Sequence, residues 1–247
     1  MKSFVKWLIA LFIVLLAVIL FAWSFVPGML SKELTQKSGV PVSISSVGLT
    51  PWSITISDFT MGNPPGSILS KALYVGTTKV KAPFYRYFED KIVINEATLN
   101  NIYLGLEFEK PFSQQGNWTQ IMRNFDRNTK GDGGKPVLIK KLIITNMDIE
   151  MAFRDNPNQP PKRLKGIKRM ELQNVSSEGG LPIAAITNQV IGSMLQEVFN
   201  REGIQNMIQG IFNPNQPGGV FGGLKSLFGA NESSEDELLN TTTGVEE

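Results

Sequence analysis

The sequence predicts a mainly β protein with helices. Three observations support this class: an uncharged run from Trp7 to Val26, alternating apolar residues from Pro41 onward, and apolar stripes at helical spacing after Leu181. We expect an N-terminal transmembrane helix, an elongated, curved antiparallel β-sheet and C-terminal amphipathic helices. The predicted divisions are a membrane anchor at 1–28, a β domain at 29–180 with a short helix at 117–126, an amphipathic helical segment at 181–229 and an acidic disordered tail at 230–247.

The N-terminal run is long enough for a membrane helix. Its twenty residues would rise about 30 Å as a helix, the thickness of a bilayer's hydrocarbon core. Lys2 and Lys6 precede it, and Pro27-Gly28 breaks it. A cleaved signal peptide is the alternative, although Ala22-Trp23-Ser24 is a poor cleavage site because of its bulky centre. The anchor residues we select from this run are Trp7, Leu8, Leu15, Leu16, Trp23 and Val26.

The body of the chain repeats one apolar spacing three times. Seven apolar positions from Val42 to Ile56 have spacings that recur from Ile92 to Leu106, and again, forty-five residues later, from Val137 to Met151. A spacing of three inside a period-two pattern indicates a β-bulge or tight turn, so each copy is expected to be a bent strand or a hairpin. The seven positions of the first copy are Val42, Ile44, Val47, Leu49, Trp52, Ile54 and Ile56.

Weaker strand patterns lie between and after these copies, at 73–84 and 164–172. An ordinary antiparallel sheet with one packed face explains the alternation, whereas the repetition favours an elongated sheet whose apolar face needs a cover. The predicted helix over 117–126 could cover part of it. The stripe from Ile183 to Val198 could cover more, or could lie on a membrane surface.

The order of these parts resembles the AsmA-like family of Gram-negative envelope proteins. The resemblance consists of the N-terminal membrane helix, VSISSVGLTPWSITISDFTMGNPPG, the element ending in LEFEKPF, the helix begun by Asn117-Trp118, and VLIKKLIITNMDIEMAF. It covers roughly residues 1–200. It implies a half-open, taco-like β groove lined with apolar residues, of a kind associated with phospholipid transport and outer-membrane homeostasis. FTMGNPPG is also similar to a segment of late-embryogenesis-abundant β-sandwich domains.

Catalysis has little support in this sequence. The chain contains no cysteine and no histidine, which excludes thiol and histidine-dependent catalysis and Cys/His zinc sites. Glu107 and Glu109 could pair as carboxylates, but solvated positions on a strand are the preferred interpretation. The segment Gly131–Pro136 lacks the spacing of a phosphate loop. We therefore predict no enzyme, no cofactor and no catalytic or metal-binding residue.

These inferences combine into a functional expectation. We expect a single-pass protein of the bacterial inner membrane, its N-terminus cytoplasmic and the bulk of its chain periplasmic, that binds or helps pass phospholipid along an apolar groove. The alternative is a structural or assembly factor that acts through an envelope protein partner or self-association. A net charge of +2 does not suggest nucleic-acid binding. Groove candidates are Ile44, Ile54, Ile92, Ile94, Leu99, Leu104, Leu106, Val137, Ile139, Ile144, Ile149 and Met151; headgroup or partner candidates are Lys162, Arg163, Lys165, Lys168 and Arg169.

Overall fold

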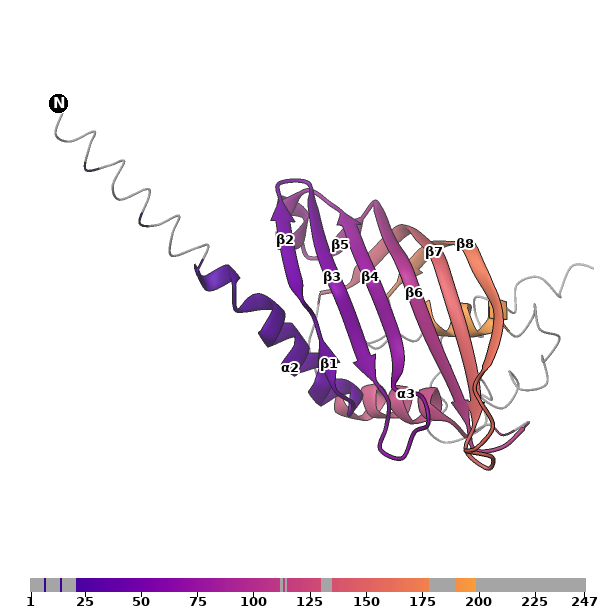
Figure 1. Cartoon of the computed structure of the whole chain (residues 1–247). Coiled ribbons are helices and arrows are strands. Elements are labelled where there is room, and N and C mark those ends of the chain that lie inside the picture. Colours follow the sequence, from indigo (N-terminus) through magenta and orange to yellow (C-terminus); the bar gives the residue numbers. More distant parts are fainter. Residues whose placement is uncertain are drawn as a thin grey trace, which may run out of the picture.

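The computed structural model of the chain describes residues 7, 14, 21–111, 113, 115–129, 135–177 and 190–198. These residues form a mainly β fold whose mixed sheet is not closed (Figure 1). The strands are β1 (Val42–Ser43), β2 (Ser46–Thr50), β3 (Ser53–Gly62), β4 (Lys71–Lys81), β5 (Ile92–Ile94), β6 (Glu96–Phe108), β7 (Val137–Phe153) and β8 (Lys162–Ser176). The helices are α2 (Val26–Ser38), the 3-10 helix η1 (Phe84–Phe88), α3 (Asn117–Asn128) and the segment 190–198.

The sheet is mixed, so the expectation of an antiparallel sheet is wrong in part. Strands β2, β3, β4 and β6 follow one another antiparallel, but β6 and β7 pair in parallel. A parallel pair needs a long crossover, which the connection containing α3 provides. The pairing register joins Ile92 to Val137 and Leu106 to Met151, so two copies of the repeat lie side by side at their forty-five-residue offset.

Left-handed backbone conformations recur on one line across the sheet. Asn101 in β6 has φ 57° and Asn146 in β7 has φ 53°, and the register places them opposite each other. Asp58 in β3 has φ 51° and lies on the same line across the sheet, opposite Gly76 of β4. Asparagine and aspartate tolerate this conformation better than other non-glycine residues. These left-handed residues therefore lie on one line across β3, β6 and β7, with no register shift between the strands at that line, and the apolar side chains that follow them return to the same face.

The first copy of the repeat folds differently from the other two. It forms the hairpin β2–β3, whose strands are joined by a turn at Pro51-Trp52. Trp52 is consequently in the turn and 70% exposed, so its assignment to the apolar face of a strand is wrong. We call the end of the sheet that carries this turn the turn end, and the opposite end, beside α3, the closed end.

A single hydrophobic core covers the inner face of the sheet. From β3 to β8 the register aligns apolar side chains into rows, one of which runs Met61, Leu73, Leu104, Ile149, Leu164. Helix α3 contributes Trp118, Ile121, Met122 and Phe125 to the same core, as its helical spacing predicts. In the described segment 190–198, Ile191, Met194, Leu195 and Val198 are also buried in this core. This part of the C-terminal stripe therefore packs on the sheet.

Helix α2 was not expected from the sequence. Pro27, interpreted as a helix breaker, lies in the first turn of α2, where its missing N–H costs nothing. The preceding residues Ser24 and Phe25 form a turn, and the helical Phe21 to Trp23 come before it.

Most of the predicted membrane run lies outside the described residues, including Leu8, Leu15 and Leu16. Within the part of the chain that the structure describes, no helix is both long and apolar enough to cross a membrane. The rest of 181–229 and the acidic tail at 230–247 also lie outside it.

Candidate functional site

The apolar face of the sheet changes in exposure along the strands. Near the closed end, Leu73, Leu104 and Ile149 are between 0 and 8% exposed beneath the helices. Toward the turn end the apolar positions on β3 and β4 are less covered, whereas Ala97 and Leu142, which continue the same row on β6 and β7, are buried. This gradient divides the face into a packed part and a more accessible part.

The accessible part consists of two short rows near the turn end. The register aligns Leu49, Ile54 and Val80 in one row; Ile56 and Leu99 belong to the next row, in which Thr78 of β4 lies between them. Leu49 is 39% exposed and the other four apolar residues are half-buried. We call these five apolar residues the half-exposed rows. Their apolar surface offers lipid-like molecules an area that side chains of the core do not fully cover.

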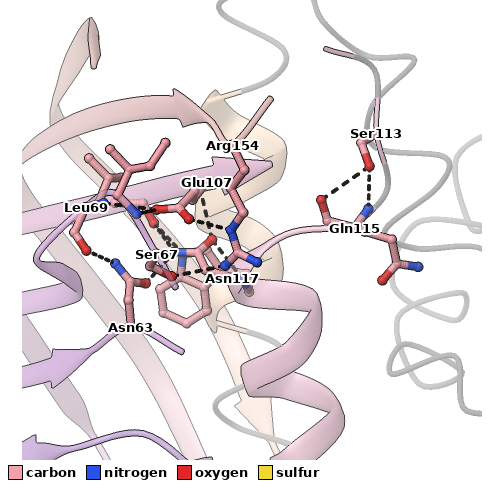
Figure 2. Close-up of polar contacts among 11 residues, drawn as sticks. Asn63, Ser67, Leu69, Glu107, Ser113, Gln115, Asn117 and Arg154 are labelled. Carbon is pink, nitrogen blue, oxygen red and sulfur yellow. Dashed lines mark hydrogen bonds and ion pairs between the residues drawn. The ribbon is translucent and has the colours of Figure 1, made fainter. Parts of the chain in front are cut away.

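A buried ion pair fastens the closed end (Figure 2). The Glu107 side chain is completely buried, and its Oε1 accepts a hydrogen bond from Nε of Arg154 at 2.5 Å. Its Oε2 accepts the backbone N–H groups of Ile68 and Leu69 at 2.8 and 3.0 Å. Arg154 also donates to Ser67 Oγ at 3.0 Å. One carboxylate thus joins the β3–β4 loop, the end of β6 and the residue that follows β7.

Asn117 extends this network to the start of α3. Its Oδ1 accepts the backbone N–H of Glu107 at 3.0 Å, and its Nδ2 donates to the Gly105 carbonyl oxygen at 2.9 Å and to Asn63 Oδ1 at 2.8 Å. Trp118 Nε1 donates to the same Gly105 carbonyl at 2.9 Å. The network thus joins parts of the chain that are far apart in sequence: Asn63 at the β3–β4 loop, Glu107 at the end of β6, and Asn117 at the start of α3.

The network shows that the interpretation of Glu107 as a solvated strand residue is wrong. The β3–β4 loop covers its part of the strand, whereas Glu109, beyond the end of β6, is exposed. The two carboxylates do not form a pair. The Glu107 carboxylate accepts hydrogen bonds from Arg154 and from two backbone amides, so its role is structural. We call the Glu107–Arg154 pair and these amides the buried clamp.

The predicted groove residues all belong to the inner face or its edges, but they differ in accessibility. Ile54, Ile92, Leu99 and Val137 are half-buried. Leu104, Leu106, Ile144 and Ile149 are between 0 and 2% exposed, because helices pack on them. A third group is 7–9% exposed and consists of Ile44, Ile94, Ile139 and Met151. A ligand on this face could therefore reach the first group far more readily than the other two.

The predicted basic run lies on β8, which in the described sheet pairs with β7 alone. Lys162, Arg163, Lys165, Lys168 and Arg169 are all exposed. Arg163 Nε lies 3.3 Å from Glu150 Oε1, and an Arg169 guanidinium nitrogen lies 3.2 Å from Glu171 Oε2. Leu164 and Ile167, between the cations, are buried in the core. The cations therefore do not line the apolar face. Charged side chains on an edge strand hinder its pairing with another chain, and these five cations suit that role.

The outer face of the sheet is polar around the line of left-handed residues. Lys71 Nζ lies 5.1 Å from the ring centroids of both Tyr74 and Tyr103. Burial and a 2.9 Å hydrogen bond to Glu150 raise the pKa of Tyr103 well above its ordinary value. An open hollow of about 590 Å³ lies here and is lined by Tyr74, Asn101, Ile102, Tyr103, Asn146, Met147, Asp148, Gly166, Ile167 and Lys168. Within the described residues, no three His, Cys, Asp or Glu side chains gather as a metal site.

The chain was compared with protein-family models, curated proteins and solved structures. No family model, curated protein or solved structure matches it.

Proposed function

We propose that this protein is a membrane-anchored protein of the bacterial envelope that binds phospholipid on its inner sheet face and contributes to envelope lipid homeostasis. The acyl chains would contact the half-exposed rows, and the headgroup would stay in water. The observation that carries the proposal is the change from a packed closed end to half-exposed rows on one continuous apolar face.

The energetics of this contact follow from the hydrophobic effect. Each methylene group removed from water contributes about 0.8 kcal/mol, so even a short stretch of acyl chain on these rows would offset the cost of ordering it. The fully buried positions Leu104, Leu106, Ile144 and Ile149 are not part of the proposed contact surface. They support the rows by holding α3 and the segment 190–198 against the sheet.

The anchor is the uncharged run from Trp7 to Val26, which would place the protein in the inner membrane with its sheet in the periplasm. The resemblance to the AsmA-like family supports this placement and the lipid substrate class. The proposal includes no catalytic step, metal or cofactor.

A charge placed on the half-exposed rows tests the proposal. In the Ile54→Asp variant a carboxylate would face the acyl chains, whereas Thr55→Asp places the same charge on the opposite face of the same strand. Native mass spectrometry of the purified full chain should find bound phospholipid in the wild type and in Thr55→Asp, and lose it in Ile54→Asp. Thermal unfolding of both variants is the control for folding.

Absence of bound phospholipid from the wild type, or its retention by a folded Ile54→Asp variant, would contradict the proposal. A second candidate function, a protein-binding assembly factor, is favoured by the tight packing near the closed end. One stoichiometric protein partner, recovered without lipid, would support that second function.

A further inference from the structure

The turn end carries exposed aromatic side chains on two separate loops. Trp52 in the β2–β3 turn is 70% exposed, and Tyr85 and Phe88 in η1 are 58% and 69% exposed. The register pairs Ser53 at the start of β3 with Lys81 at the end of β4, so both loops leave the sheet at the same end. Figure 1 shows the β2–β3 turn at the upper end of the sheet with α3 at the other.

Helix η1 is held in place by Tyr87 and by a backbone contact, and two of its rings stay exposed. Tyr87 packs against the core, which turns Tyr85 and Phe88 outward. Lys135 Nζ donates to the Phe88 carbonyl oxygen at 3.0 Å and so ties η1 to the start of β7. Exposed aromatic rings held on a rigid support have the composition and placement of a docking surface.

The N-terminal segment approaches the same end. The C-terminal part of α2 lies near the closed end, where Thr35 Oγ1 accepts the N–H of Val42 at 2.9 Å. Its upstream extension lies farther toward the turn, because Trp23 Nε1 donates to the Val47 carbonyl oxygen at 2.6 Å. The described residues from Phe21 to Phe25 therefore precede α2 on the side toward the turn end. Of the described residues in the N-terminal run, Trp7, Val14, Phe21 and Phe25 are between 55 and 75% exposed.

Basic side chains accompany the aromatic rings. Lys79 and Lys81 at the end of β4 and Lys135 before β7 are exposed beside the loops. Tryptophan and tyrosine with neighbouring lysines are typical of the boundary between acyl chains and headgroups. Among the described strands, β2 pairs only with β3 and leaves one edge open, but the exposed aromatic and lysine side chains of this end match a bilayer boundary better than they match a strand-pairing partner.

We infer that Trp52, Tyr85 and Phe88 form a docking surface that inserts into the lipid bilayer from which the N-terminal segment emerges. This inference rests on the proposed function, and it specifies where the lipid would enter. The half-exposed rows begin directly behind the β2–β3 turn, because Leu49 and Ile54 flank it. Docking at this end would place the accessible apolar rows against the membrane surface.

Single thiols can test the docking, because the natural chain contains no cysteine. We would place the full chain in vesicles of phosphatidylethanolamine and phosphatidylglycerol, carrying Trp52→Cys or Phe88→Cys labelled with an environment-sensitive fluorophore. Asn158→Cys is the control, since it is also exposed but lies on the β7–β8 loop at the closed end. Circular dichroism of the sheet checks folding in each variant.

The inference predicts a blue shift and quenching by doxyl-labelled lipid at positions 52 and 88, and neither effect at position 158. Iodide quenching at 52 and 88 equal to that at 158 would overturn it. Protection from iodide without quenching by doxyl lipid would also overturn it, because a protein would then cover the surface. Docking together with a wild type that carries no bound phospholipid would refute the proposed function but support this surface.

Discussion

Removing the charge of Glu107 tests whether the closed end is held by the buried clamp. In Glu107→Gln the amide oxygen can still accept the backbone N–H groups of Ile68 and Leu69, but its NH₂ group faces the Arg154 guanidinium, which is left without a counter-charge. In Arg154→Met the carboxylate stays completely buried without its cation.

The magnitudes follow from burial. Breaking a buried pair by removing one partner costs about 3–5 kcal/mol. The Arg154 side chain is 26% exposed and can regain some water, so Glu107→Gln should lie near the lower limit of that range. Arg154→Met should lie near the upper limit, since Glu107 is 0% exposed and cannot be hydrated in place.

Urea unfolding of the full chain in detergent micelles measures both changes, with the circular dichroism of the sheet as the signal. The double variant should be more stable than the sum of the single changes predicts, because the two groups act on each other. Single costs below about 1 kcal/mol, or strict additivity, would refute the reasoning and show that the clamp has no more effect than a surface ion pair.

Three further predictions concern the core, the left-handed residue Asn101 and the half-buried Tyr103. Ile144→Ala should destabilise the fold by about 2–5 kcal/mol, whereas half-exposed Ile54→Ala should cost about 1 kcal/mol or less; equal costs in urea unfolding would argue against graded packing. Asn101→Gly should leave stability nearly unchanged, whereas Asn101→Val should cost about 1–2 kcal/mol, because φ is 57° at this position. Thermal unfolding that ranks the two variants in reverse would exclude a left-handed conformation at Asn101. Burial and Glu150 raise the pKa of Tyr103, so its neutral form stabilises the fold below pH 10, and this stabilisation should decline above pH 10, where the tyrosine ionises in the unfolded chain. Tyr103→Phe should weaken that decline. An unchanged dependence of stability on pH in this variant would count against the raised pKa.

The strands of the body were largely predictable, because their apolar periodicity records which face is buried. The repeat also contains the register, since two copies forty-five residues apart pair at that offset. Apolar periodicity could not predict whether neighbouring strands run parallel or antiparallel. A helical crossover between Phe108 and Val137 allows parallel pairing, and the predicted helix over 117–126 was the available signal for it.

The clamp was not predictable from the strand pattern. Alternation assigns Glu107 to the face opposite the core, and its burial depends on a loop from another part of the chain. Helix α2 was missed for a different reason. Proline breaks a helix when it lies in the interior but is favoured in the first turn. Pro27 follows the helical residues 21–23 and lies in the first turn of α2, so one proline accounts for both the break and the new helix.

The accessible part of the apolar face likewise depends on tertiary contacts. Ile54 and Ile144 both occupy apolar positions in the repeat, and nothing local distinguishes them. The placement of the helices decides that Ile144 is buried and that Ile54 is not. Sequence therefore identified the face, while the structure identified which members of it a ligand could reach.

Photocrosslinking in the membrane tests the central claim most directly. A photoreactive amino acid at Ile54 lies on the half-exposed rows, and one at Thr55 lies on the opposite face of the same strand. After irradiation of cells that express the full chain, mass spectrometry should find a phospholipid adduct at position 54 and none at position 55. Equal lipid adducts at both positions, or protein adducts alone at position 54, would contradict the account.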